Sequence, residues 1–212
     1  AVGFVDVPSL KGIHYAMQSG LYAARAAFAA LKQSDLSAAR LSGAPHVITV
    51  FDVGEHGTQP YIVMEYLEGG SVSDRLREGS VPSRVALEWL DQAGQALDRA
   101  HAEGIVHRDV KPANLLVGAG GVTKLGDFGM ALGTAELSVG NAHIRVGTPY
   151  YTAPEIWAGG KASASSDIYS LGVTLYELLT LEPAYTGRDR QELLKQIAFD
   201  EPRRPRSLTR DI

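Results

Sequence analysis

Apolar and polar residues follow each other along the chain in two periods, one typical of short strands and one of helices. The runs Val47–Val53 and Tyr61–Glu65 are rich in β-branched and aromatic residues on either side of a glycine-containing turn, so they predict a hairpin. A second hairpin is predicted where Leu115–Val117 and Val122–Leu125 flank a glycine-rich turn. The expected strands are therefore few, short and locally paired.

Three later segments have the 3.6-residue period of helices. A helix is expected over Ser83–Glu103, with Ser83 as its N-terminal cap and Gly104 as its stop. Its apolar stripe comprises Val85, Trp89, Leu90, Ala93, Leu97 and Ala100. Residues 167–180 are apolar around most of the circumference, which predicts a buried helix, and residues 185–197 predict an amphipathic one. Together with the hairpins, these helices predict an α+β fold.

The composition narrows the function without naming it. With 212 residues and 45% hydrophobic content, the chain is long enough to bury a core. A net charge of -4 makes nucleic acid a poor candidate partner, and the lack of cysteine excludes a disulfide framework, a thiolate zinc site and thiol catalysis. The longest apolar stretch, Leu171–Leu181, is too short for a membrane segment. We therefore expect a cytoplasmic protein, with an oligomeric state that the sequence leaves open.

The groups that phosphoryl transfer requires lie close together in residues 107–129. Asp109 can accept a proton from an incoming hydroxyl, and Lys111 can neutralise charge on the transferring phosphate. Asn114 and Asp127 offer the oxygen ligands that magnesium prefers. Because the second predicted hairpin returns Asp127 towards Asn114, the spacing allows one shared metal site.

The segments His107–Asn114 and Asp127–Gly129 resemble the catalytic loop and the magnesium motif of the protein kinase family. The resemblance implies a two-lobed kinase-like fold that uses ATP and Mg²⁺ and acts on a protein substrate. The implied catalytic residues are Asp109, Lys111 and Asn114, and the implied metal ligands are Asn114 and Asp127. Lys111, together with Gly147-Thr148-Pro149, resembles the serine/threonine branch of the family, in its bacterial form.

The resemblance also implies where the nucleotide lies. The residues from Met64 to Gly70 match the hinge between kinase lobes, where backbone groups of Glu65 and Leu67 would bind adenine. The implied nucleotide-binding residues are Met64, Glu65, Leu67, Lys111, Asn114, Leu116 and Asp127. As family members do, the chain would pack His107 in the interior and use Asp167 to anchor the backbone of the catalytic loop.

The segment between Asp127 and Glu155 is rich in small and polar residues and resembles a kinase activation segment closed by Ala153-Pro154-Glu155. Within it, Thr134 and Ser138 are candidate phosphorylation sites, because Arg108 beside Asp109 offers a cation to a new phosphate. Without that context, both hydroxyls would be ordinary solvated loop residues.

The start of the chain departs from the kinase pattern. No Gly-x-Gly-x-x-Gly occurs, and Lys32 fits a solvated helix residue better than a phosphate-binding lysine. Residues 1–41, with an alanine-rich predicted helix over Tyr22–Lys32, are similar to a stretch of electron-transfer flavoprotein-ubiquinone oxidoreductases. A chimeric or mis-joined start is one interpretation of this segment.

The sequence predicts an N-terminal segment at 1–44 that is not kinase-like, a remnant of the small lobe with its hinge at 45–68, and a large lobe at 69–212 that lacks its last helices. The predicted function is a serine/threonine kinase fragment with weak activity. The first alternative is a catalytically impaired kinase-like binding module, and the second is a fragment of a flavin-dependent oxidoreductase. A glutamate–lysine pair near Met64 would favour the enzyme over the module.

Overall fold

The computed structural model describes residues 40–41, 43–56, 59–128 and 149–209, and the expectations for residues 1–39 and for most of the activation segment lie outside this part. The described chain begins with an antiparallel hairpin of β1 (Val50–His56) and β2 (Gln59–Met64). A second antiparallel hairpin follows later, formed by β3 (Leu115–Val117) and β4 (Thr123–Leu125). Both sheets are two-stranded, as the sequence predicts.

Helices make up most of the rest. They are α3 (Val72–Glu78), α4 (Ser83–Ala102), α6 (Pro154–Trp157), α7 (Ala164–Thr180), α8 (Arg190–Phe199) and α9 (Pro205–Leu208). Short 3₁₀ turns occupy Pro112–Asn114, Ala119–Gly121 and Pro149–Tyr151. None of the helices in the described ranges combines the length and apolarity needed to span a bilayer.

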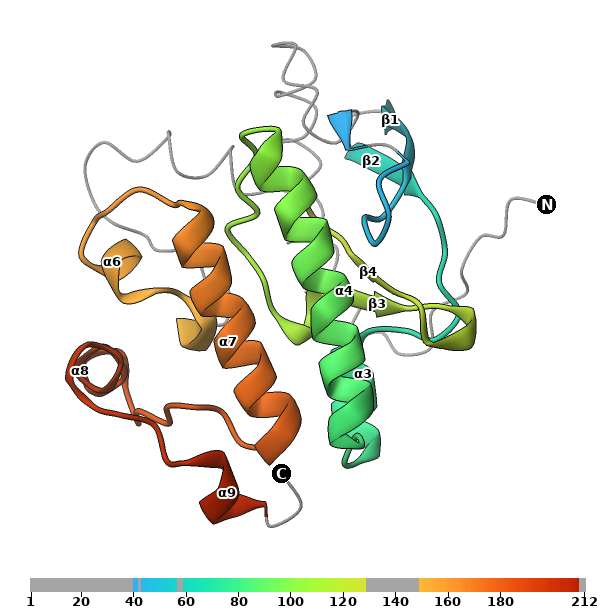
Figure 1. Ribbon diagram of the computed structural model, residues 1–212. Coiled ribbons are helices and arrows are strands. Elements are labelled where there is room, and N and C mark those ends of the chain that lie inside the picture. Colours follow the sequence, from blue (N-terminus) through green and yellow to red (C-terminus); the bar gives the residue numbers. More distant parts are fainter. Residues whose placement is uncertain (1–39, 42, 57–58, 129–148, 210–212) are drawn as a thin grey trace.

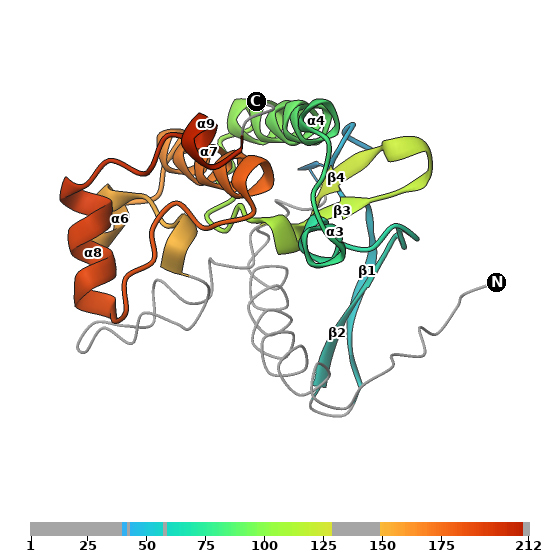
Figure 2. The same cartoon turned by 90° about the horizontal axis from the view of Figure 1, so that it is seen from below.

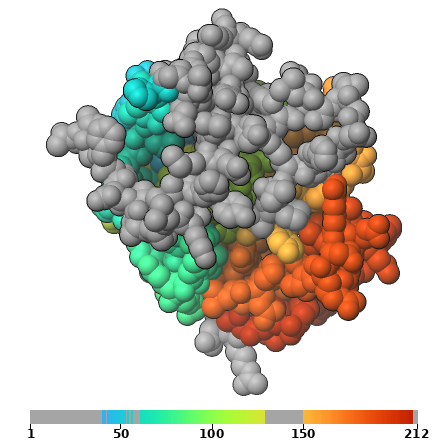
Figure 3. Space-filling model, turned by 180° about the vertical axis from the view of Figure 1, so that it is seen from behind, coloured from blue at the N-terminus to red at the C-terminus, as the bar shows by residue number. Residues whose placement is uncertain are grey.

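The long helices α4 and α7 lie side by side, with α8 and α9 beyond α7 (Figure 1). The β3–β4 hairpin lies between α4 and the β1–β2 hairpin (Figure 2). Seen from behind, the first hairpin and the C-terminal helices occupy opposite sides of the molecule (Figure 3). This arrangement is an α+β fold with a small hairpin unit on one side and a mostly helical unit on the other.

The hydrophobic core is centred on the buried face of α4. Its alanines and large apolar residues pack against the strand residues Leu115, Val117 and Leu125 and against Leu178 of α7. The predicted stripe is confirmed, since Trp89, Leu90, Ala93, Leu97 and Ala100 are buried and Val85 packs against them. Gly104, with φ of 73°, ends α4 in the left-handed conformation that glycine adopts readily.

The first hairpin differs from its predicted bounds. β1 continues through His56, so the expected turn at 54–57 lies mostly within the strand. Val47 is not part of this hairpin but forms a parallel bridge with Leu125, and it is only 4% exposed. Pairing of β1 with β2 starts only at Val50, which lies opposite Met64, and a register shift follows between Val50 and Asp52. Burial against β4 therefore outweighs continued pairing with β2 at this position.

The buried helix α7 begins at Ala164 instead of residue 167, with Ser163 as its cap. Two other helix starts also differ from prediction. The cap of α4 is Pro82, whose carbonyl accepts from the amides of Val85 and Ala86, and Ser83 is the first helical residue. The last amphipathic helix begins at Arg190 instead of residue 185, because Asp189 caps it by accepting from the amide of Glu192 at 2.8 Å. In both cases the residue immediately before the first helical residue is the cap, and the sequence pattern does not predict it as a cap.

Helix α3 was missed from the sequence, although its signal is present. Ser71 and Asp74 form a capping box, in which each side chain accepts from the backbone amide of the other residue. The segment is short, with Val72 its one fully buried residue, so its apolar period is weak. The cap was the stronger signal at this position.

Candidate active site

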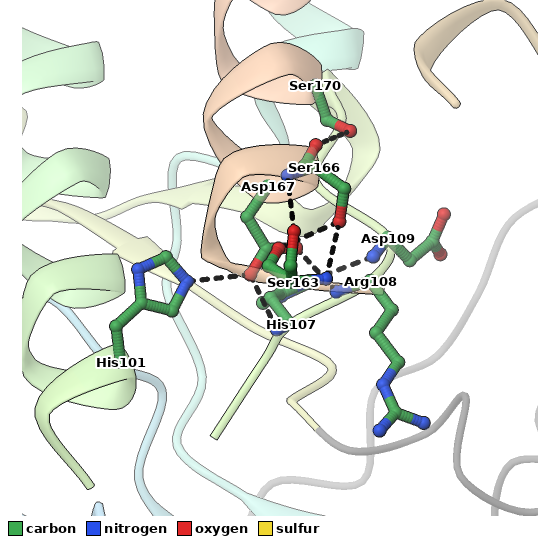
Figure 4. Close-up of polar contacts among 8 residues, drawn as sticks. All are labelled: His101, His107, Arg108, Asp109, Ser163, Ser166, Asp167 and Ser170. Atoms are coloured by element: carbon green, nitrogen blue, oxygen red, sulfur yellow. Dashed lines mark hydrogen bonds and ion pairs between the residues drawn. The ribbon is translucent and has the colours of Figure 1, made fainter. Parts of the chain in front are cut away.

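The catalytic loop is fastened to helix α7 by a single buried carboxylate. Asp167 is 1% exposed, and its two oxygens accept from the backbone amides of His107 and Arg108, each at 2.8 Å. The ring of His101 on α4 adds a third contact, with Nε2 2.8 Å from Oδ2 (Figure 4). The geometry implied for Asp167 by the family resemblance is therefore present.

This anchor holds the loop in an uncommon backbone conformation. Arg108 has a φ of 74° and Asp127 a φ of 63°, both in the left-handed region that residues with a Cβ avoid. Such conformations persist where surrounding contacts over-determine them, and they concentrate at functional sites. Here both fall on motif residues, and the loop beside Arg108 is fixed by Asp167.

His107 lies at the centre of the loop as a neutral, fully buried ring. Its Nε2 is 2.7 Å from the carbonyl of Gly126, and its Nδ1 accepts from the amide of Asp109 at 3.2 Å. A carbonyl can only accept and an amide can only donate, so the proton must be on Nε2. Burial lowers the pKa of His107, which agrees with the neutral form. Its ring also meets Phe128 edge to face, with centroids 4.5 Å apart. The expected packing role is confirmed.

Asp109, Lys111 and Asn114 converge at one point. Lys111 Nζ lies 2.6 Å from Asp109 Oδ2, and the side-chain amide of Asn114 donates to the carbonyl of Asp109 at 2.7 Å and to Oδ2 at 3.1 Å. The Asp109 side chain is 48% exposed, so it remains open to an incoming group. With the Asn114 nitrogen engaged by Asp109, the amide oxygen is the atom available for a metal.

Asp127 belongs to the same site. The amide of Gly126 donates to the Asn114 carbonyl at 2.9 Å, which ties the residue before Asp127 to the other expected metal ligand. Desolvation raises the pKa of Asp127 and the carboxylate of Asp109 raises it further, while the positive charge of Lys111 acts in the opposite direction. A cation placed between the two aspartates would relieve this repulsion.

The donor set fits magnesium that arrives together with phosphate oxygens. Within the described ranges, no group of three or more histidine, aspartate or glutamate side chains could hold a metal unaided. Asn114 and Asp127 supply oxygens, the donors magnesium prefers, and magnesium commonly uses one or two protein ligands plus substrate phosphates. These two residues match that requirement.

Backbone hydrogen bonds join the hinge to β3 next to the expected adenine position. Gly69 donates to the carbonyl of Val117 at 2.8 Å, and the amide of Val117 donates to the carbonyl of Gly70 at 2.8 Å. A Cβ at position 69 would collide with that same Val117 carbonyl, so the hinge approaches the strand as closely as only glycine permits. These contacts hold the hinge residues Gly69 and Gly70 directly against β3.

The expected adenine-binding residues line this hinge and the strand beneath it. Met64 at the end of β2 is 38% exposed, and Leu116 is half-buried on the middle of β3. The amide of Glu65 donates to the carbonyl of Thr49 at 2.9 Å, which leaves its own carbonyl as the group to face a ligand. Leu67 lies two residues further along the same hinge.

A glutamate–lysine pair is present near Met64, but it is not the pair that positions phosphates in kinases. Lys124 Nζ lies 2.7 and 2.9 Å from the two carboxylate oxygens of Glu65. The lysine comes from β4 and the glutamate from the hinge, whereas the expected pair would come from the small-lobe strand and helix that precede β1. Lys124 was missed from the sequence, because the two residues are far apart along the chain.

Comparisons with known proteins agree with the geometry. Residues 30–208 match the protein kinase domain family, a range that begins before Pro45, and the separate character of residues 1–44 stays a prediction. The serine/threonine-protein kinase PknB of Mycobacterium leprae is 40% identical over 164 residues, covering 74% of this chain and 26% of that protein.

Two other relatives give similar values. PknB of Mycobacterium tuberculosis is 41% identical over 165 residues, covering 74% of this chain and 26% of that protein. A probable serine/threonine-protein kinase PknB of Lactococcus lactis is 37% identical over 144 residues, covering 68% of this chain and 23% of the relative. The chain thus spans about a quarter of the length of these curated relatives. With a match over most of its length and the loop geometry described above, the chain belongs to the protein kinase family.

Proposed function

We propose that the chain carries the phosphoryl-transfer site of a bacterial serine/threonine protein kinase. The observation that supports this most directly is the anchored loop, in which Asp167 fixes the backbone before Asp109 while Lys111 and Asn114 fix its carboxylate. Preorganised groups of this kind need no rearrangement when a substrate arrives. The relatives named above suggest serine or threonine as the acceptor.

In the proposed reaction, the hydroxyl oxygen of the substrate attacks the γ-phosphorus of ATP. A new O–P bond forms, the bond between the γ-phosphorus and the β–γ bridging oxygen breaks, and ADP leaves. Asp109, as the base, accepts the hydroxyl proton at its half-exposed carboxylate. Lys111, already 2.6 Å from that carboxylate, is placed to neutralise charge on the transferring group.

The remaining proposed roles concern the nucleotide. Asn114 and Asp127 would hold Mg²⁺, which when bound shields the charge of the phosphates. The Glu65 carbonyl and the Leu67 amide would bind the adenine edge, between Met64 and Leu116. We also propose a protein as the phosphate acceptor and a cytoplasmic location for the chain, and cell fractionation would test the location.

Transfer of ³²P from labelled ATP to a generic basic protein tests the proposal. We expect weak, Mg²⁺-dependent transfer, because residues 1–44 show no glycine-rich loop and losing one preorganised donor costs on the order of 10² to 10³ in rate. A hybrid with a complete small-lobe start should be faster. Asp109→Asn should abolish transfer in both proteins, while Asp98→Asn, an exposed change on α4, should not. Transfer that survives Asp109→Asn would refute the assignment.

The same variants separate the alternatives. A kinase-like binding module would bind Mg-ATP but show no transfer even in the hybrid, and the missing glycine-rich pattern is the observation that favours it. A flavin-dependent oxidoreductase is suggested only by residues 1–41, which lie almost wholly outside the described ranges. Flavin absorbance in the purified protein would support that alternative.

A further inference from the structure

The Glu65–Lys124 pair joins two parts of the site that lie far apart along the chain. Several other ion pairs in the described part join residues three or four apart on or beside a helix. Here the side chains are only 19% and 23% exposed, and both carboxylate oxygens contact the ammonium. Partly buried, charge-assisted hydrogen bonds of this kind are stronger and geometrically more specific than exposed pairs.

The hinge end of the pair is held at several points. The amide of Thr49 donates to Glu65 Oε1 at 2.6 Å, while the amide of Glu65 donates to the Thr49 carbonyl at 2.9 Å. Partial burial alone would raise the pKa of Glu65, but the hydrogen bonds from Lys124 and Thr49 lower it overall. The carboxylate is therefore charged at neutral pH and fixes the hinge residue at both its side chain and its backbone.

The strand end of the pair lies on the face of β3–β4 that turns towards the nucleotide position. In the hairpin register, Lys124 pairs with Leu116, so the two side chains share one face. Their neighbours Leu115, Val117, Thr123 and Leu125 are all buried on the opposite face. Lys124 therefore lies beside Leu116, the β3 residue expected to contact adenine, and its ammonium contacts Glu65 of the hinge.

The two residues between Lys124 and Asp127 are both held by backbone hydrogen bonds. Leu125 exchanges backbone hydrogen bonds with residues 46 and 48, at 2.8 and 3.0 Å, and Gly126 donates to the Asn114 carbonyl at 2.9 Å. Lys124 is therefore joined to Gly126, the residue beside Asp127, through a short segment held by backbone hydrogen bonds. A ligand that contacts both the hinge and Asp127 requires a fixed spacing between them.

We propose that Lys124 and Glu65 are positioning residues, which set the hinge that binds adenine at a fixed distance from the strand that carries Asp127. The inference rests on the proposed function. Adenosine contacts only the hinge side of this arrangement, whereas Mg-ADP engages both sides. The pair therefore contributes little to adenosine binding and much to the additional affinity of Mg-ADP.

Calorimetry on the full chain with adenosine and with Mg-ADP tests this inference. Lys124→Met and Glu65→Gln remove the pair from its two ends, Lys124→Arg keeps it, and Lys161→Met removes an exposed lysine as the matched control. We expect Lys124→Met to leave the adenosine dissociation constant within about twofold. Both Lys124→Met and Glu65→Gln should reduce the additional affinity of Mg-ADP by about tenfold. Lys124→Arg and Lys161→Met should retain that additional affinity.

Three outcomes would overturn the inference. Equal weakening of adenosine and Mg-ADP would indicate a general structural role, and an unchanged advantage for Mg-ADP in Lys124→Met or Glu65→Gln would show that the pair positions nothing. If Lys124→Met does not fold, Glu65→Gln decides between these results, because its amide oxygen can still accept from Thr49. A wild-type chain with no advantage for Mg-ADP would instead refute the proposed function, and the inference with it.

Discussion

Removing the carboxylate of Asp167 should loosen the catalytic loop before it unfolds the protein. Asp167→Ala leaves the amides of His107 and Arg108 without their acceptor, at a position that is 1% exposed. An unsatisfied buried amide costs about 1 to 3 kcal/mol, so the two together cost about 2 to 6 kcal/mol. At about 2 to 4 °C per kcal/mol, the Tm should fall by roughly 4 to 24 °C.

The loop should respond more strongly than the rest of the protein. Arg108 holds a left-handed conformation that costs of order 1 to 3 kcal/mol, and Asp167 is the contact that fixes its amide. Amide hydrogen exchange should therefore become faster at 107 and 108 by more than it does along α4, even where the variant remains folded. Asp167→Asn, which keeps one acceptor oxygen, should have a smaller effect.

Circular dichroism melts and residue-resolved hydrogen exchange measure these two effects. The exposed change Asp98→Ala on α4 is the matched control and should stay within about 0.5 kcal/mol of the wild type. If Asp167→Ala matches that control in Tm and leaves exchange at 107 and 108 unchanged, the proposed anchor contributes nothing and the reasoning fails.

Three further predictions test other parts of the site and fold. A raised pKa in the folded state makes ionised Asp127 destabilising at neutral pH, so Asp127→Asn should raise Tm there. The gain should shrink on acidification through that raised pKa, and a gain that grows instead would contradict the sign. Gly69→Ala should cost about 1 to 3 kcal/mol in urea unfolding by driving a methyl into a β3 carbonyl, whereas Gly94→Ala, with open space on α4, should stabilise by about 0.5 to 1 kcal/mol. Ser71→Ala should cost about 1 kcal/mol and Ser83→Ala almost nothing, and equal melting curves would argue against the assigned caps.

Spacing within one short segment was the most informative signal in the sequence. Asp109, Lys111 and Asn114 are separated by a few residues, so their convergence follows from the local turn that carries them. The second hairpin was also predictable, because its strands are joined by a glycine-rich turn and pair locally. The anchoring role of Asp167 came from family resemblance, and no local pattern indicates it.

Contacts between distant segments could not be read in this way. Glu65 and Lys124 are 59 residues apart, and nothing near either residue specifies the other. A partial signal existed, since Lys124 alternates with the apolar Leu125 and the buried Thr123 and so belongs to the opposite face of the strand. Val47 was assigned to the wrong pairing for the same reason, because its partner Leu125 lies far along the chain.

The two faces of the β3–β4 hairpin also determine where the chain can tolerate insertions. Residues 119–121 at the turn are exposed, so an added residue there would leave both strands in register. A residue added between Thr123 and Lys124 would exchange the faces of the strand, moving Lys124 into the core and Leu125 towards the nucleotide position. Among related sequences, gaps should therefore accumulate in the turn and be absent from the residues that follow it. The length of that segment is as strict a requirement as the identity of its aspartate.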